Sequence, residues 1–310
     1  MRDISSVLIV GAGAVGAGVA SIIHESEPGS LRVLADPGRL ARYEAEGFMI
    51  NGRRFDFPLA PVGSPRRKGE ESDLVIVAVK NHHLGKAISD MASFVGEGTL
   101  ILSLLNGITS EEDLAAAFGR EKVPYAMILG IDAVREGNST SFSAAGKIHF
   151  GDARNRSGAW SERVSGIASY FDRVGVGYVV PEDMVRSLWY KFMINVGINQ
   201  ASAVLGAPYG VFQSLPEAKE AMYGAMRELI EISRAMGTGL SDADLESWYG
   251  TLLGLSPDAK TSMLQDVEAK RKTEVEAFAG TVVALGERTG LPTPINRLFL
   301  NLIRTMEQTY

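Results

Sequence analysis

A glycine-rich turn near the N-terminus constrains the fold more than any other part of the sequence. The apolar run Val7–Val10 ends at Gly11-Ala12-Gly13-Ala14-Val15-Gly16, an amphipathic segment follows, and a second apolar run, Leu31–Ala35, ends at Asp36. This order of strand, Gly-x-Gly-x-x-Gly, helix, strand and acidic residue is that of a dinucleotide-binding βαβ unit. Its glycines allow a tight turn, a close approach of the backbone to a pyrophosphate, and close packing of helix on strand. We therefore expect a nicotinamide-type dinucleotide at this helix N-terminus, the alternative being a glycine-rich turn without a ligand.

The acidic residue bears on which dinucleotide is bound. Asp36 lies 20 residues after Gly16, where a carboxylate accepts hydrogen bonds from the adenosine ribose hydroxyls and repels a 2′-phosphate, which favours NAD(H). Arg39 and Arg42 are close enough in sequence to attract that phosphate and favour NADP(H). The residues alone leave both cofactors open.

Two polar residues directly follow apolar runs that have the character of buried strands. Lys80 follows Leu74–Val79, and Asn106 follows Leu100–Leu105. Ligands of open α/β sheets bind at the carboxyl ends of the strands, so we predict a ligand role for both residues. The alternative is that they only mark where the strands leave the core.

The segment from Phe48 to Phe57 has the pattern of a β-hairpin. Asn51-Gly52 separates Phe48–Ile50 from Arg53–Phe57. An Asn-Gly pair fits a two-residue primed turn, so we expect a hairpin here.

The composition excludes several classes of site and of partner. The 310 residues include no cysteine, which excludes disulfides and cysteine-ligated metals, and the four histidines show no helical metal-ligand spacing. A formal net charge of −6 and the lack of a strongly basic segment argue against nucleic-acid binding. No apolar run reaches the roughly 18 residues of a membrane helix, and the N-terminus lacks a signal-peptide pattern. We expect a cytoplasmic monomer or homodimer with no metal, membrane or nucleic-acid partner.

The hydrophobic pattern changes at Pro181. Before it, strand-like apolar runs alternate with helical segments, and after it apolar residues recur mostly at helical period. We predict an α/β protein with an N-terminal Rossmann-type doubly wound sheet, residues 1–180, followed by an all-α helical substrate and catalytic domain, residues 181–310. Helices of this second domain are expected at residues 217–236, 242–255, 262–289 and 296–307.

The most distinctive helical segment is Trp189–Asn199. As an α-helix it places Lys191, Asn195 and Asn199 at i, i+4 and i+8 on one face, while most of its other residues are apolar. Buried ammonium and amide groups are destabilising unless they have partners, and a polar ligand in a cleft supplies partners. The alternative is a half-buried helix whose lysine reaches water and whose amides bond to backbone.

A second pair of candidates lies further along the chain. Ser262 and Gln265 have the spacing of a capping box, with Ser262 as the N-cap of a helix that runs to about Thr289. Glu274 lies 12 residues after Ser262, about 120° round such a helix, so the two do not share a face. If both are functional, the serine acts at the N-terminus of the helix and the glutamate along its side. The alternatives are that Ser262 only caps the helix and that Glu274 only pairs with Lys270.

Together these segments resemble the ketopantoate reductase (2-dehydropantoate 2-reductase) family, nearly end to end. The matching motifs occur in the family's order: Gly11-x-Gly13-Ala14-x-Gly16, Val79-Lys80, Asn106-Gly107, Trp189-x-Lys191-x-x-x-Asn195-x-x-x-Asn199, and Ser262-Met263-Leu264-Gln265-Asp266 with Thr273-Glu274. The last two motifs are far more specific than the glycine motif. The resemblance implies reduction of ketopantoate to pantoate with NADP(H), a step of pantothenate and coenzyme A biosynthesis, in an interdomain cleft.

The resemblance also implies a role for each matching residue. Lys191 is the expected general acid, and Glu274 is the expected carboxylate that completes the active site near the cofactor. The implied substrate contacts are Asn106, Asn195, Asn199 and Ser262. The implied cofactor contacts are Gly11, Ala12, Gly13, Ala14, Val15, Gly16, Asp36, Lys80, Asn106, Ala133 and Glu274.

The chain departs from the family pattern at three places. The segment Gly130–Gly137 is shorter, so the contact expected at Ala133 aligns less securely. Tyr209 replaces a further substrate-side asparagine, which keeps open a reductase or dehydrogenase for another 2-oxo or 2-hydroxy acid. Asp36 stands where the family often has arginine, which keeps NAD(H) open. A β-hydroxyacid dehydrogenase and a non-catalytic dinucleotide sensor are the remaining alternatives.

Overall fold

The computed structural model describes residues 3–63, 71–131, 134–136 and 139–310. The chain forms two compact units. Unit 1 consists of Met1–Leu105 and Thr109–Met184, and unit 2 consists of Asn106–Ile108 and Val185–Tyr310. The main division therefore falls just after Pro181, and one short loop of the first half groups with the second.

A five-stranded parallel sheet forms the centre of unit 1. Its strands are β1 (Val7–Val10), β2 (Leu31–Ala35), β5 (Leu59–Pro61), β6 (Leu74–Val77) and β7 (Leu100–Ser103). They are ordered β5-β2-β1-β6-β7, and every neighbouring pair is parallel. The sheet starts with β1 at its middle and grows outward to both sides, as in a Rossmann fold.

Both faces of this sheet are covered by helices, which explains why its strands are apolar throughout. In β1, Val7 and Ile9 join a core cluster with residues of α1 (Ala14–Ser26) and α5 (Glu162–Val174). Leu8 and Val10 point to the other face, into a cluster with residues of α3 (Leu84–Met91) and α4 (Ser110–Phe118). The alternation of side chains along β1 thus builds two cores on one sheet.

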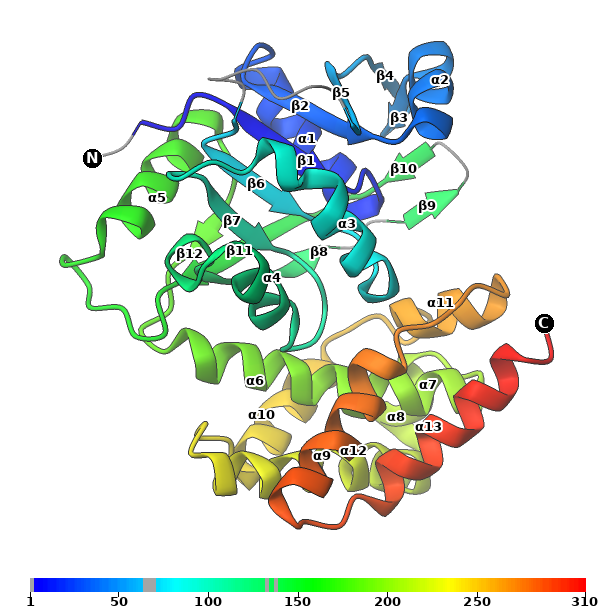
Figure 1. Cartoon of the computed structure of the whole chain (residues 1–310). Helices are drawn as coiled ribbons and strands as arrows, with labels where there is room; N and C mark the ends of the chain where they lie inside the picture. Colours follow the sequence, from blue (N-terminus) through cyan, green and yellow to red (C-terminus); the bar gives the residue numbers. More distant parts are fainter. Residues whose placement is uncertain (1–2, 64–70, 132–133, 137–138) are drawn as a thin grey trace. The chain divides into compact units, whose positions relative to one another are not determined.

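The rest of unit 1 consists of two smaller sheets, α2 and short 3₁₀ turns, drawn from blue to green in Figure 1. One sheet has the order β4-β3-β10-β9 and the other β12-β11-β8. These strands are β3 (Phe48–Ile50), β4 (Arg53–Phe55), β8 (Tyr125–Ile131), β9 (Val134–Glu136), β10 (Ser139–Ser141), β11 (Ala145–Gly151) and β12 (Tyr178–Val179). The other elements are α2 (Pro37–Glu46), η1 (Asn81–His83), η2 (Ala92–Phe94) and η3 (Arg120–Lys122).

The predicted hairpin is confirmed. β3 and β4 are antiparallel, with Ile50 paired to Arg53 across a two-residue turn. Asn51 and Gly52 in that turn have φ of 47° and 77°. Positive φ at both central positions is what a type I′ turn requires, and Asn and Gly adopt it most readily.

Unit 2 is helical in the part of it that the structure describes. Its segments are α6 (Met184–Ile194), η4 (Asn195–Asn199), α7 (Gln200–Leu205), α8 (Tyr209–Ser214), α9 (Pro216–Met236), α10 (Asp242–Leu253), α11 (Ser262–Glu268), η5 (Glu276–Gly280), α12 (Thr281–Thr289) and α13 (Pro294–Glu307). The two η segments here are π-helical turns. The helices run from green to red in Figure 1, and the buried face of α9 contributes Met222, Met226, Leu229 and Ile230 to their common core. The predicted fold class, a Rossmann-type sheet followed by a helical part, is confirmed.

The single helix predicted from Ser262 to Thr289 is wrong. α11 ends at Glu268, and Lys270 has a φ of 51°, which an α-helix does not accommodate. Thr273 then bonds to Glu307: the backbone N and the Oγ1 of Thr273 donate to Glu307 Oε1 at 2.7 Å and 2.6 Å. These bonds to a distant residue replace helical ones. No helix of the described residues is long and apolar enough to cross a membrane.

Candidate active site

The glycine turn of unit 1 has the backbone geometry that its sequence predicts. Gly11 has a φ of 98°, and a Cβ there would lie 2.8 Å from Ala78 O. A Cβ on Gly16 would lie 2.0 Å from Gly11 O, so any larger residue would force the turn and α1 apart. Glycine is therefore required at both positions by close packing and, at Gly11, also by conformation.

The start of α1 fits an anionic ligand. Gly13 is the N-cap and offers no side-chain capping bond, and the first turn has no acidic residue. A Cβ on Gly13 would meet only Ala78 O, at 3.9 Å, so the backbone here faces open space that a side chain would fill. Unpaired N–H groups at a helix N-terminus bind phosphates. These features fit the pyrophosphate of a dinucleotide, bound by the backbone of Gly11–Gly16.

Asp36 has a structural role in addition to its predicted one. It is the N-cap of α2, and its Oδ1 accepts from Arg39 N at 3.0 Å. The Arg39 guanidinium also lies 3.6 Å from Asp36 Oδ2. A carboxylate and a cation thus share the end of β2, where the adenosine ribose of a dinucleotide is expected. Arg42 lies over the ring of Tyr43 instead, 5.2 Å from its centre.

Lys80 lies three residues after β6 ends, at the edge of the sheet that also carries the glycine turn. It is half-buried and caps the short 3₁₀ turn η1, in which His83 N donates to Lys80 O at 2.8 Å. The strand is shorter than predicted, but the residue keeps its expected place beyond the strand end. Ala133 lies outside the described residues.

In unit 2, the predicted stripe of one lysine and two asparagines lies on a helix that changes type. Lys191 is half-buried near the end of α6, whereas Asn195 and Asn199 are buried in the π-helical turn that follows. The unbroken α-helical path assumed for these residues is therefore wrong. The two asparagines are still side by side, because Asn199 Nδ2 donates to Asn195 Oδ1 at 3.2 Å.

Asn195 carries an unusual polar group. Asn195 is 8% exposed, and its Nδ2 has no hydrogen-bond partner among the described residues. A buried amide donor without a partner is destabilising by about 1–3 kcal/mol. Such groups are rare in native folds and call for a ligand or water to complete them. This donor lies four residues after Lys191, one helical turn along the chain.

The loop after β7 contributes Asn106 to unit 2. Its Nδ2 donates to Glu274 Oε2 at 3.0 Å, and Glu274 is only 6% exposed. The alternative interpretation of Glu274 as a helical partner of Lys270 does not hold, because the chain between them is not helical. Instead, a buried carboxylate and an amide from a distant loop form one polar pair.

The capping prediction for Ser262 is wrong by one residue. Thr261 is the N-cap of α11, and its Oγ1 accepts from Leu264 N at 3.1 Å and donates to Ser202 Oγ at 3.1 Å. Threonine caps nearly as well as serine, and here its buried position allows both bonds. Ser262 is the first residue of the helix and is exposed, and its hydroxyl is not the capping group.

Sequence reasoning missed one buried polar side chain beside these candidates. Gln200 follows Asn199 directly and has no exposed surface. Its amide bonds to Val196 O at 2.6 Å, to Asn296 Oδ1 at 3.2 Å and to Ala279 N at 3.0 Å. A third amide residue on an otherwise apolar helix was the available signal.

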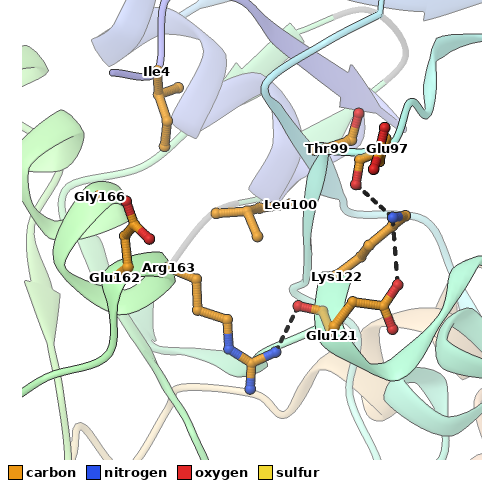
Figure 2. A pocket seen from close by; sticks show the side chains of 10 residues that line it. Ile4, Glu97, Thr99, Leu100, Glu121, Lys122, Glu162, Arg163 and Gly166 are labelled. Atoms are coloured by element: carbon orange, nitrogen blue, oxygen red, sulfur yellow. Dashed lines mark hydrogen bonds and ion pairs between the residues drawn. The ribbon is translucent and has the colours of Figure 1, made fainter. Parts of the chain in front are cut away.

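Figure 2 shows a cavity of about 220 Å³ in unit 1 that none of the candidate residues lines. Leu100, which lines it, is the first residue of β7. The cavity therefore lies at the amino ends of the parallel strands, whereas the glycine turn lies at their carboxyl ends. Its cations already have partners: Lys122 Nζ donates to Glu97 O at 2.6 Å, and Arg163 Nη1 donates to Glu121 O at 2.8 Å. We assign no chemistry to it. Within the described ranges, no three His, Asp or Glu side chains are grouped as metal ligands.

Comparison with known proteins decides the family. A sequence model described as "Ketopantoate reductase PanE/ApbA" matches residues 7–155, and one described as "Ketopantoate reductase PanE/ApbA C terminal" matches residues 183–307. The 2-dehydropantoate 2-reductase of Pyrobaculum aerophilum is 30% identical over 78% of this chain and 80% of its own length. The chain belongs to the ketopantoate reductase family.

Two further likenesses extend over nearly the whole chain. The 2-dehydropantoate 2-reductase of Aquifex aeolicus is 26% identical over 97% of this chain and 96% of its own length. A solved structure of D-mandelate dehydrogenase with NADH and anilino(oxo)acetate has a TM-score of 0.86 at 20% identity, covering 98% of each chain. This likeness in fold to D-mandelate dehydrogenase extends through both units. Ketopantoate reductases are oxidoreductases, and the predicted family is confirmed.

Proposed function

We propose that this chain reduces 2-dehydropantoate to pantoate with NADPH or NADH, as a step of pantothenate and coenzyme A biosynthesis. Family membership supports the reaction type. The observation that carries the proposal is the buried, unpaired Nδ2 of Asn195, one helical turn after Lys191. An amide donor left without a partner beside a lysine is suited to a polar substrate that accepts hydrogen bonds.

The reaction places particular demands on the protein. When bound, a reduced nicotinamide supplies hydride to the carbonyl carbon of a 2-oxo acid, and the neighbouring oxygen gains negative charge. An ammonium within hydrogen-bond reach stabilises that charge and supplies the proton. We assign this role of general acid to Lys191.

The substrate also has to be held without adding excess charge. The amides of Asn195 and Asn199 offer N–H donors to a hydroxyl or carboxylate of the substrate. Ser262, whose hydroxyl is not used for capping, offers another. The amide of Asn106 and the carboxylate of Glu274, hydrogen-bonded at 3.0 Å, form a fixed pair. We assign all five to substrate binding or to completing the active site.

Cofactor binding is assigned to unit 1. The backbone of Gly11–Gly16 and the first turn of α1 fit the pyrophosphate. Asp36 and Arg39 both lie where the adenosine ribose is expected. The choice between NADH and NADPH therefore depends on whether repulsion of the 2′-phosphate by the carboxylate outweighs its attraction to the guanidinium. Lys80 is the further candidate contact at the same sheet edge. The D-mandelate dehydrogenase whose structure is similar was solved with NADH, which supports a nicotinamide dinucleotide.

One observation favours a second candidate, reduction of another 2-oxo acid. Tyr209 stands where the family has a substrate-side asparagine, and its N donates to Ala259 O at 3.1 Å, shortly before Ser262. Burial raises the pKa of its hydroxyl, so the phenol stays neutral at physiological pH. An aromatic ring in place of an amide favours a more apolar substrate. The likeness to D-mandelate dehydrogenase agrees with that direction.

A substrate panel tests both. The protein is mixed with NADPH or NADH and with 2-dehydropantoate, 2-oxoisovalerate, pyruvate or benzoylformate, and oxidation is followed by the absorbance of the reduced nicotinamide. We expect the highest kcat/KM with 2-dehydropantoate. A higher value with benzoylformate supports the second candidate instead. Cofactor binding without turnover of any 2-oxo acid contradicts both and favours a dinucleotide sensor.

A further inference from the structure

Two segments of unit 2 leave the α-helical path next to the proposed reacting groups. The π-helical turn Asn195–Asn199 follows Lys191, and the π-helical turn Glu276–Gly280 follows Glu274. Such turns are rare and occur frequently at functional sites. A π turn shifts the backbone hydrogen bonds by one residue, so some groups that an α-helix would pair need other partners.

The side chain of Gln200 supplies partners in both turns. Its Nε2 donates to Val196 O at 2.6 Å, in the first turn, and its Oε1 accepts from Ala279 N at 3.0 Å, in the second. Because a carbonyl only accepts and a backbone N–H only donates, these contacts fix which end of the amide is which. One side chain with no exposed surface therefore joins the two π turns.

The second turn shows why Ala279 needs such a partner. Gly280 N donates to Val275 O, five residues back, at 3.0 Å, and Phe278 N reaches the same oxygen at 3.2 Å. In an α-helix that carbonyl, four residues back, would accept from Ala279. Gln200 Oε1 takes its place and satisfies a buried donor.

Gln200 is itself held by a buried polar network. Its Nε2 also donates to Asn296 Oδ1 at 3.2 Å. Asn296, which has no exposed surface, donates through Nδ2 to Ala225 O at 3.0 Å and to Glu228 Oε2 at 2.7 Å. Fully satisfied networks of this kind make the surrounding structure rigid. The bridge between the π turns is thus anchored to α9 and α13.

We propose that Gln200 is a positioning residue for the reaction, which holds the turn bearing Asn195 in register with the turn after Glu274. This inference rests on the proposed function and deepens it. Val196, which Gln200 bonds, is the neighbour of Asn195. Two backbone N–H groups of the second turn donate to Glu274 O, at 3.0 and 3.1 Å. Losing the bridge therefore shifts a substrate donor relative to the carboxylate, and a displacement of about 1 Å costs on the order of 10²-fold in rate.

Gln200→Met and a matched control separate positioning from stability. The variant keeps the volume of the side chain but removes all three hydrogen bonds. Gln213→Met is the control, because Gln213 Nε2 also bonds two backbone oxygens, Leu252 O and Leu255 O at 2.9 Å each, but joins α8 to the end of α10. We expect both variants to lower the Tm, and only Gln200→Met to lower kcat, by about tenfold or more. The KM for the cofactor should stay unchanged in both.

Gln200→Glu tests the same bridge without removing its atoms. When protonated, the carboxyl accepts from Ala279 N and donates its O–H to Val196 O, so both turns stay joined. When ionised, it places a buried charge against two acceptors, Val196 O and Asn296 Oδ1. Burial favours the neutral acid. The activity of this variant relative to the wild type should therefore rise as the pH is lowered.

The outcomes are distinguishable. Suppose that the wild type turns over and that the kcat of Gln200→Met is within twofold of the wild-type kcat, at a temperature where both proteins are folded. This result overturns the positioning role and leaves the proposed function standing. If Gln200→Met does not fold, a flat pH profile of relative activity for Gln200→Glu overturns it equally. No turnover by the wild type overturns the proposed function and, with it, this inference.

Discussion

Asn106 and Glu274 lie 168 positions apart in the sequence, yet Asn106 Nδ2 donates a hydrogen bond to Glu274 Oε2 at 3.0 Å. Glu274 is 6% exposed, and a buried carboxylate is stable only when donors surround it. Both residues belong to unit 2, in which the loop Asn106–Ile108 is grouped. The family motifs Asn-Gly and Thr-Glu are thus two halves of one contact.

Replacing the donor of this pair should destabilise the protein. Asn106→Ala leaves the buried Glu274 carboxylate with one donor fewer, so we expect the free energy of unfolding to fall by about 1–3 kcal/mol. Urea denaturation measures it. Asn301→Ala, on the exposed side of α13, is the control and should change it by less than about 0.5 kcal/mol. Equal effects of the two substitutions would mean that the bond contributes nothing.

The assignment of Lys191 as general acid predicts a loss of turnover without a loss of cofactor. Lys191→Met should lower kcat by about 10²–10⁴-fold, because the proton donor and its charge are both removed, and should leave the Kd for NADPH or NADH within twofold. Steady-state kinetics and a binding titration measure the two. Lys86→Met, whose ammonium is exposed and pairs with Asp90 on α3, is the control. Normal turnover by Lys191→Met would remove this residue from the acid role.

Local patterns predicted the parts of the fold that depend on neighbouring residues. The glycine turn, the strand before it and the end of β2 at Asp36 follow from apolar runs and from backbone space that only glycine provides. The Asn51-Gly52 hairpin follows from the φ values that its turn type requires. In each case the deciding contacts lie within a few residues or within one βαβ unit.

Distant contacts decided what the sequence did not predict. The break between α11 and the second π turn depends on Thr273 bonding to Glu307, 34 residues away. The bridge from Gln200 to Ala279 spans 79 residues. Helical periodicity carries no sign of either, because both replace backbone bonds that an uninterrupted helix would make. The candidate residues were named from motifs, but the polar pairs among them needed the tertiary structure.

The glycine turn predicts two different outcomes for one substitution type. Gly16→Ala places a Cβ 2.0 Å from Gly11 O, so it should lower both the Tm and the cofactor affinity. In Gly13→Ala the nearest atom that the added Cβ would meet is Ala78 O, at 3.9 Å, so the free energy of unfolding should stay within about 1 kcal/mol of the wild-type value. The same Cβ should weaken cofactor binding tenfold or more, because it fills the space beside the helix N-terminus. Thermal unfolding and titration with NADPH or NADH separate the two. Unchanged affinity in Gly13→Ala would place the pyrophosphate elsewhere.

Cofactor choice should respond to the two charges at the end of β2. Asp36→Asn keeps the N-cap of α2 and removes the negative charge, so the ratio of kcat/KM for NADPH to that for NADH should rise by about tenfold. Arg39→Gln should lower the same ratio. Arg42→Gln, whose guanidinium lies over Tyr43, is the control and should change the ratio less than either. A ratio unchanged in both Asp36→Asn and Arg39→Gln would contradict the placement of the ribose.

A buried carboxyl group in unit 1 should make the stability depend on pH. Glu111 is 2% exposed at the start of α4, where its Oε2 accepts from Ser110 Oγ at 3.1 Å and its Oε1 accepts from Ala126 N at 3.4 Å. Burial raises the pKa of Glu111 from its ordinary 4.5 to about 7, against the opposing effect of these bonds and of Arg120. The folded state therefore holds a proton that the unfolded state releases at lower pH.

The sign of the effect follows from this difference. Well below pH 4.5 the carboxyl of Glu111 is protonated in both the folded and the unfolded state, and its full contribution to stability is present. Between pH 4.5 and 7 only the unfolded state has lost this proton, so the free energy of unfolding falls as the pH rises. Glu111→Gln cannot ionise, so the free energy of unfolding of the wild type should drop by up to about 3 kcal/mol relative to this variant across that window. Urea denaturation at a series of pH values measures it. Glu112→Gln, whose side chain is 67% exposed, is the control and should stay parallel to the wild type. Parallel curves for wild type and Glu111→Gln would show that folding does not raise the pKa of Glu111.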